Sequence, residues 1–126
     1  MNSFILAVPS QAPGGLDAAM SAHFGHCDVY TLVEIIDNKA HSVKTVPPVP
    51  HEKGGCLAAV EHLAGHGVGK LLAGGMGMRP LTGFQQAGIE VYHVAEPLSV
   101  GQAVQAFLDG RLRAFGTELT CRGGCH

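Results

Sequence analysis

Histidine and cysteine are the residue types in this chain best suited to chemistry, and most of them gather in three clusters. The 126 residues include eight histidines and four cysteines. Imidazole and thiolate groups are common ligands of soft and borderline metal ions, so such clusters indicate metal or thiol chemistry. The clusters comprise His23, His26 and Cys27, then His51, Cys56, His62 and His66, and finally Cys121, Cys125 and His126.

The first cluster follows the first apolar run of the sequence. His23, His26 and Cys27 are close enough along the chain to contribute ligands to one metal ion. A surface loop that binds nothing is the alternative. The expected fold places this cluster at the same sheet edge as a glycine-rich loop, which favours a binding site.

The second cluster falls on a predicted helix. Cys56 opens this helix after two glycines, where the helix dipole lowers a thiol pKa. It also lies on the apolar face of the helix, so a buried and unreactive thiol is an equal alternative. His62 and His66 are four residues apart and could place two imidazoles on one metal ion. They lie on the polar side of the helix without a third ligand at suitable spacing, which favours a solvated helix surface.

The third cluster lies on a C-terminal tail, residues 116–126, beyond the predicted domain of residues 1–115. Cys121, Cys125 and His126 could fill three positions of a tetrahedral metal site. Their spacing departs from the usual pair of cysteines separated by two residues. A structural zinc site, a clamp for a soft metal such as copper, and an unoccupied tail all stay open.

A glycine-rich stretch offers a different kind of site, for an anion. A short apolar run stops at Gly74, Gly75 and Gly77, where the missing Cβ atoms let a ligand approach the backbone closely. Pro80 suits the first turn of a following helix, whose free N–H groups and positive dipole end point at the same place. Arg79 adds a full positive charge. A tight turn with a solvated arginine is the alternative, and the pattern is not a nucleotide-binding fingerprint.

Hydrophobic periodicity and turn residues predict the elements that position these clusters. Strands are expected at residues 4–8, 30–36, 41–46, 70–73 and 89–94. Helices are expected at 56–66 and 81–87, and a third follows a capping box of Ser99 and Gln102 and ends at Gly110. The first three strands have no helix between them, so they form an antiparallel meander, and the last two lie parallel to the first. The prediction is a single α/β domain with a mixed five-stranded sheet in the order 3-2-1-4-5, flanked by about three helices.

This topology brings the glycine loop and the first His/Cys cluster to one edge of the sheet. The loop follows the fourth strand, and His23, His26 and Cys27 follow the first strand, which is its parallel neighbour. Ligands of open α/β sheets bind at the carboxyl ends of the strands. The loop and the cluster are therefore predicted to form two walls of one pocket.

Composition and charge exclude several classes of function. The formal net charge of −2 gives no reason to expect nucleic acid or an acidic membrane as a partner. No basic leader and no apolar run of membrane-spanning length is visible, so we expect a cytoplasmic protein with reduced cysteines. Asp17, Glu34 and Asp37 are scattered, and no catalytic triad or carboxylate pair can be read from their spacing. We therefore expect a binding protein and no enzyme.

The order and spacing of several short stretches resemble the dinitrogenase iron–molybdenum cofactor biosynthesis family. That family includes carriers of the NifX and NafY type, the C-terminal domain of NifB, and small orange proteins that carry a molybdenum–copper sulfide cluster. The stretches are Ile5-Leu6-Ala7-Val8-Pro9-Ser10, Gly15-Leu16-Asp17, Ser21-Ala22-His23-Phe24-Gly25, Gly54-Gly55-Cys56, Leu72-Ala73-Gly74-Gly75-Met76-Gly77, Ala87-Gly88-Ile89-Glu90-Val91-Tyr92 and Ala103–Gly110.

The resemblance implies a ribonuclease-H-like fold and non-catalytic binding of an anionic metal–sulfur cluster. It matches the family's S-x-H-F-G histidine to His23, and the family's glycine loop to Gly74, Gly75 and Gly77. A bulky, soft anion of this kind needs backbone N–H groups, a cation and a metal ligand. Here Arg79 would be the cation, and the thioethers of Met76 and Met78 would add soft contacts.

The chain also departs from the family pattern at its cysteines. Cys27, Cys56 and the tail cysteines are unusual, which leaves open whether the cluster is of the molybdenum–iron or molybdenum–copper type or a precursor, and whether thiolates bind it. The expected partners are the cluster and a protein that donates or accepts it. The alternative is a zinc- or copper-binding regulatory module that uses Cys121, Cys125 and His126.

Overall fold

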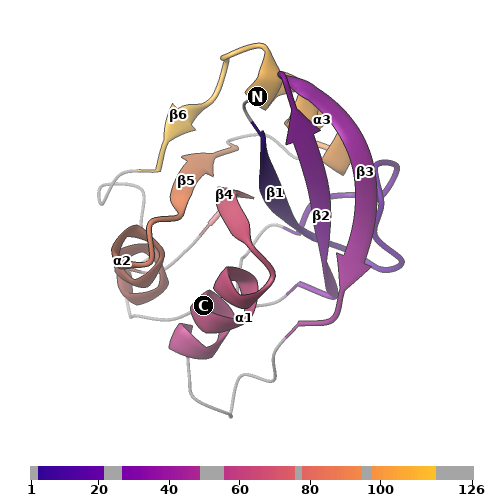
Figure 1. Ribbon diagram of the computed structural model, residues 1–126. Helices are drawn as coiled ribbons and strands as arrows, with labels where there is room; N and C mark the ends of the chain where they lie inside the picture. Colours follow the sequence, from indigo (N-terminus) through magenta and orange to yellow (C-terminus); the bar gives the residue numbers. More distant parts are fainter. Residues whose placement is uncertain (1–2, 22–26, 49–55, 76–77, 95–97, 116–126) are drawn as a thin grey trace.

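A mixed β-sheet with helices on both faces forms the centre of the chain (Figure 1). The computed structural model describes residues 3–21, 27–48, 56–75, 78–94 and 98–115. Within these residues the elements are β1 (Ser3–Ser10), β2 (Val29–Ile36), β3 (Lys39–Val46), α1 (Cys56–Gly65), β4 (Val68–Ala73), α2 (Met78–Gln86), β5 (Glu90–His93), α3 (Val100–Leu108) and β6 (Arg113–Ala114). None of these helices has the length and apolarity needed to cross a bilayer.

The strand order is β3-β2-β1-β4-β5-β6, which confirms the predicted order of the first five strands. β1, β2 and β3 form an antiparallel meander, while β4 is parallel to both β1 and β5. The prediction missed β6, which pairs with β5 through Ala114 opposite Tyr92 and Arg113 opposite His93. Two residues are too few to show an alternating pattern in the sequence.

β1 runs farther than predicted, through Pro9 to Ser10. We expected this strand to end at Val8, before Pro9, and that expectation is wrong. The Pro9 carbonyl accepts a hydrogen bond from the N–H of Ser21 at 2.9 Å, so the backbone polar groups of Pro9 point away from β2. Its missing N–H is therefore not needed for the ladder between β1 and β2, and the strand can continue.

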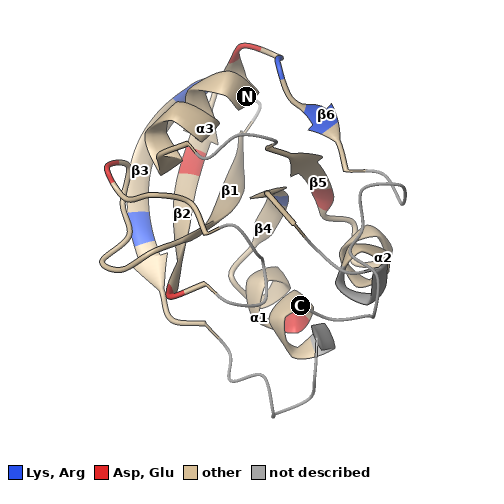
Figure 2. Ribbon diagram, turned by 180° about the vertical axis from the view of Figure 1, so that it is seen from behind, with Lys and Arg blue, Asp and Glu red and all other residues tan. Residues whose placement is uncertain are grey.

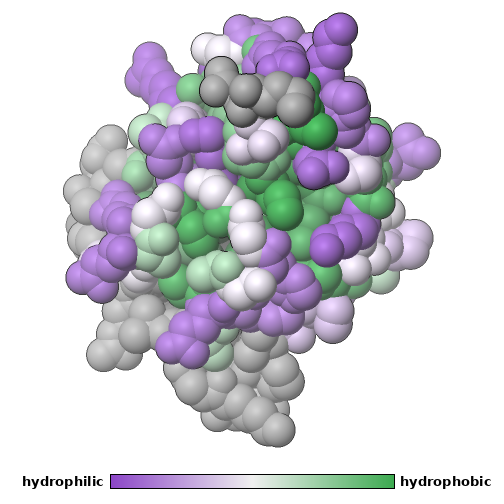
Figure 3. Space-filling view, in the orientation of Figure 1, coloured by the Kyte–Doolittle hydropathy of each residue, from purple (hydrophilic) through white to green (hydrophobic). Residues whose placement is uncertain are grey.

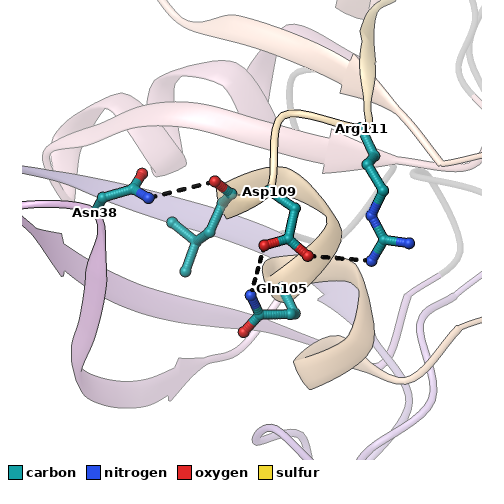
Figure 4. Close-up of polar contacts among 5 residues, drawn as sticks. Asn38, Gln105, Asp109 and Arg111 are labelled. Carbon is teal, nitrogen blue, oxygen red and sulfur yellow. Dashed lines mark hydrogen bonds and ion pairs between the residues drawn. The ribbon is translucent and has the colours of Figure 1, made fainter.

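A two-residue turn joins β2 to β3, between the predicted strands at 30–36 and 41–46. Asp37 and Asn38 have φ values of 50° and 66°, the left-handed backbone that a tight hairpin turn requires. The Asn38 side-chain amide donates to the carbonyl of Leu108 at 3.3 Å and thereby ties the turn to the end of α3 (Figure 4).

Two apolar layers cover the two faces of the sheet. Because neighbouring strand residues point to opposite faces, Leu6 and Val8 lie in the α3 layer and Ala7 in the layer of α1 and α2. Phe84 of α2 is completely buried in that second layer. Figure 2, the reverse view, shows α3 in front of the sheet, and among the residues coloured in this view the charged ones of neither sign gather into a patch. Figure 3 shows apolar surface in the middle of the opposite face, within a largely hydrophilic rim.

Candidate functional site

The carboxyl ends of β1, β4 and β5 meet at one edge of the sheet, as the predicted topology required (Figure 1). Ala7 of β1 pairs with Leu71 of β4, and Ala73 of β4 pairs with His93 of β5. Gly74 and Gly75 follow β4 directly at this edge, where Gly74 is half-buried and Gly75 is buried. The start of the glycine loop is thus where a ligand of an open α/β sheet would be expected.

Two backbone hydrogen bonds hold the segment after β1 at the same edge. The N–H of Ser21 donates to Pro9 at 2.9 Å, and the N–H of Asp28 donates to the carbonyl of Ser10 at 3.0 Å. Cys27, next to Asp28, is half-buried and packs against the α1–α2 apolar layer. The structure therefore brings Cys27 and Gly74 to one edge. His23 and His26 lie outside the described residues.

The thiol of Cys27 is held in its neutral form. Burial raises its pKa, and the negative charge of Asp28 adds a smaller increase. A hydrogen bond with Tyr30 lowers the pKa but does not reverse the rise. The pKa of the Tyr30 phenol is itself raised, by burial first and second by the charge that Cys27 would carry once ionised. A metal bond to Cys27 would therefore require the release of a proton.

The hydroxyl groups of Ser10 and Thr31 form a continuous series of hydrogen bonds at the end of β1. The Ser10 hydroxyl donates to Val8 at 2.7 Å, so the Thr31 hydroxyl must be the donor in its 2.8 Å contact with Ser10. Thr31 in turn accepts from the N–H of Gly15 at 3.1 Å. No buried side-chain N or O atom in the described residues lacks a partner. These hydroxyls therefore support the site and are not free to bind a ligand.

The N-terminus of α3 is closed to anions by the chain itself. The N–H groups of Val100 and Gly101 donate to the carbonyls of Ala18 and Leu16, both at 2.8 Å. The predicted capping box is confirmed, because Ser99 accepts from the N–H of Gln102 and the Gln102 side chain accepts from the N–H of Ser99. All N–H groups of this first turn already donate to acceptors within the chain, so the N-terminus of α3 has no free donor for an anion.

α2 is the helix that begins beside the glycine loop. It begins at Met78, earlier than the predicted start at Leu81, so Arg79 and Pro80 belong to its first turn. The expectation that Pro80 lies in the first turn is confirmed. Met76 and Gly77, which complete the predicted loop, lie outside the described residues. Of the predicted anion site, the structure therefore describes Gly74, Gly75 and the start of α2.

The other predicted metal ligands are not brought together by the described part of the chain. Cys56 is the first residue of α1, as predicted. Cys121, Cys125 and His126 lie outside the described residues. Within the described ranges, no three His, Cys, Asp or Glu residues gather as a metal site.

Two hollows lie elsewhere on the described surface, and each is lined by a carboxylate that already accepts hydrogen bonds. One lies at the opposite sheet edge, where Lys70 forms an ion pair with Glu90 and lowers the pKa of that carboxyl. The other lies between the β2–β3 turn and α3. There Asp109 accepts from Gln105 at 2.9 Å and from Arg111 at 3.3 Å (Figure 4).

Comparison with known proteins assigns the fold and these residues to a family. Residues 5–110 match the family model described as dinitrogenase iron–molybdenum cofactor. The chain belongs to this family. An uncharacterised protein of Methanocaldococcus jannaschii is 32% identical over 100 residues, which cover 76% of this chain and 82% of that protein. These matches confirm the family that the sequence resembles.

Two solved structures of similar proteins share the fold. The apo form of the orange protein from Desulfovibrio gigas is 31% identical, with a TM-score of 0.77 over 88% of this chain and 92% of the other. A NifB-like protein from Thermotoga is 27% identical, with a TM-score of 0.76 over 95% of this chain and 99% of the other.

The match to the dinitrogenase iron–molybdenum cofactor family separates the candidate site from the tail. The matched residues include Cys27, Gly74 and Gly75, and they run from β1 to just beyond α3. The tail cysteines Cys121 and Cys125 lie outside the matched residues. Any chemistry of this family member that depends on the tail is therefore additional to what the family model describes.

Gly14, which lets the loop after β1 pack against β2 and β3, was not predicted from the sequence. Gly14 has a φ of +80°, and a Cβ there would lie 2.6 Å from Cγ2 of Thr45 and 2.8 Å from Cγ2 of Val29. Only glycine lets the loop after β1 lie this close to the meander. The cluster of turn residues at 10–15 was the available signal, but it could not say which strand the loop would contact.

Proposed function

We propose that this chain is a cytoplasmic carrier or assembly scaffold for an anionic metal–sulfur cluster. The cluster would be of the molybdenum–iron or molybdenum–copper type, or a precursor, and the chain would bind it without catalytic turnover. Family membership over residues 5–110 is the observation that carries the proposal. The family description, dinitrogenase iron–molybdenum cofactor, supports molybdenum as part of the cargo, and the 31% identity to the orange protein supports a small carrier protein.

The site we propose is the carboxyl edge of β1 and β4. Gly74, Gly75 and Gly77 would let the cluster approach the backbone, and the first turn of α2 would supply N–H groups and the positive dipole end. Because the formal net charge of the chain is −2, attraction of an anion has to be local. We assign that role to Arg79, with soft contacts from Met76 and Met78.

A direct metal bond would come from the opposite wall of the site. Ser21 and Asp28 are both hydrogen-bonded to the end of β1, and His23 is only two residues beyond Ser21 in the chain. We propose His23 as a ligand, with Cys27 and His26 as further candidates and Cys56 at the start of α1 as a fourth. The thiol of Cys27 would bind only after losing the proton that its burial favours.

Delivery of the cluster would require a second protein that donates or accepts it. A site at the edge of the sheet suits transfer, because a cluster held by one ligand and a set of N–H groups can leave without unfolding its carrier. The alternative function, a zinc- or copper-binding regulatory module, would depend on Cys121, Cys125 and His126. It lacks the support of the family model, which ends before those residues.

Reconstitution tests the proposal. The purified chain is incubated with tetrathiomolybdate and Cu(I), or with tetrathiomolybdate and Fe(II), and excess reagent is removed by gel filtration. We expect visible charge-transfer absorption that elutes with the protein. A colourless, molybdenum-free protein from both incubations would overturn the proposal.

A further inference from the structure

Two histidines on α1 contact each other beside the end of β3. The rings of His62 and His66 have centroids 4.9 Å apart and meet edge to face at 86°. Both residues are half-buried, although their place in the sequence favoured a solvated surface. The ring of His62 also lies near that of Tyr30, with the two ring centroids 6.3 Å apart. The packing therefore limits the positions of both imidazoles.

A hydrogen bond fixes the protonation pattern of His62. Its Nε2 atom lies 2.9 Å from the carbonyl oxygen of Pro47. A carbonyl can only accept, so Nε2 must carry the hydrogen, and in the neutral ring the lone pair is then on Nδ1. Histidines that bind metals commonly donate their second ring N–H to a backbone carbonyl in this way, which orients the ring and makes the ligating nitrogen more basic.

The distance between the two rings fits a shared metal ion. A metal–nitrogen bond is about 2.0–2.1 Å long, and the ring centre lies roughly 1 Å farther along the bond. Two imidazoles bound side by side on one ion, with an angle between square-planar and tetrahedral values, therefore have centroids about 4.5–5.3 Å apart. The 4.9 Å between His62 and His66 falls within this interval.

The position on the helix also favours a cation. α1 ends at Gly65, so His62 lies in its last turn and His66 directly follows it. The carbonyl groups and the negative dipole end of a helix attract positive charge at this place.

We propose that His62 and His66 form a two-imidazole site for a borderline divalent metal ion, of the class of Cu²⁺, Ni²⁺ and Zn²⁺. Nδ1 of His62 would be one ligand, His66 the second, and water would fill the remaining positions. The described residues supply no third ligand, so the ion would exchange readily. His62 and His66 are not among the proposed cluster ligands, although their neighbour Tyr30 is hydrogen-bonded to Cys27, and this proposal does not depend on cluster binding.

Residue-resolved NMR of the full-length chain tests the site. Ni²⁺ is a suitable probe, because it is paramagnetic and is not reduced by the cysteine thiols. In a titration of ¹⁵N-labelled protein we expect the ring signals of His62 and His66 to broaden together, at the same low Ni²⁺ concentration. In H66A, the Ni²⁺ concentration that broadens His62 should rise at least tenfold, because one of two ligands is gone. H62A should have the same effect on His66.

An exposed histidine elsewhere provides the control. His41 lies on β3 and is solvent-exposed, so H41A should leave the broadening of the pair unchanged. Two results would overturn the proposal. One is broadening of His62 at an unchanged Ni²⁺ concentration in H66A, and the other is broadening of the pair only at the concentration that broadens His41. A ¹⁵N spectrum without metal verifies that each variant is folded.

Discussion

The backbone N–H of Asp28 donates to the carbonyl of Ser10 at 3.0 Å, across the carboxyl end of β1. This bond keeps Cys27 at the edge of the sheet where Gly74 follows β4. Residues that are 47 positions apart in the chain, Cys27 and Gly74, thereby belong to one candidate site. The proposed carrier function depends on that juxtaposition.

Substitution tests the two roles that we assign at the cluster site, Arg79 as the cation and His23 as the metal ligand. R79A and H23A should each weaken retention of a reconstituted thiomolybdate cluster at least about tenfold, which is the loss expected for one charge-assisted contact or one metal bond. K39A is the control, because Lys39 is an exposed cation at the start of β3, beside the β2–β3 turn at the opposite edge of the sheet. The measurement is cluster lost during dialysis, followed by visible absorption. Unchanged retention in both R79A and H23A would rule out the site we assign.

The neutral thiol of Cys27 predicts a dependence of stability on pH. In the unfolded chain a cysteine loses its proton near its ordinary pKa of 9.0, whereas in the folded chain burial raises the pKa of Cys27. Above about pH 9 the folded state therefore binds more protons, and the free energy of unfolding falls as the pH rises further. Urea unfolding of the wild type between pH 7 and 10 should show this fall, and C27A should show a shallower one. Identical pH profiles would mean that Cys27 is not protected from ionisation.

The loop that supports the site should depend on Gly14 more than on Gly15. Both residues have left-handed φ values, +80° and +93°, so alanine strains the backbone at each by about 1–2 kcal/mol. A Cβ on Gly14 would also overlap Thr45 and Val29, while a Cβ on Gly15 meets nothing within 4 Å. We expect G14A to be less stable than G15A by about 1–3 kcal/mol, the usual cost of overpacking. Equal urea midpoints for the two variants would contradict the tight contact between loop and meander.

Removal of the tail separates the two candidate functions. A chain that stops after Thr120 lacks Cys121, Cys125 and His126. The carrier proposal predicts that it retains most of the cluster bound by the full chain, because the family match ends at residue 110. The regulatory alternative predicts that it loses uptake of zinc or copper. Both can be measured on the same two proteins by elemental analysis after dialysis, and loss of the cluster upon truncation would assign the ligands to the tail.

The sequence contained enough local information to predict the order of the first five strands. Turn residues such as Asn38 and the absence of helices between the early strands indicated the meander, and intervening helices required the parallel strands. β6 could not be found, because two residues carry no periodicity. β1 could not be followed through Pro9, because its continuation depends on a hydrogen bond with Ser21, twelve residues away.

The candidate site could be placed by sequence more readily than its chemistry. Topology alone put Cys27 and Gly74 at one edge. The protonation of Cys27, however, depends on burial against residues from the α1–α2 layer, which only the folded packing determines. The contact between His62 and Pro47 likewise depends on how the end of β3 meets α1, and helical spacing of the histidines says nothing about it.

Elemental analysis of the full chain, purified from its native host, tests the carrier function most directly. A carrier of a molybdenum-containing cluster should contain molybdenum together with inorganic sulfide and with iron or copper, in amounts near one cluster per chain and with matching visible absorption. Zinc as the only metal, or a chain that never carries molybdenum in the host, would contradict it.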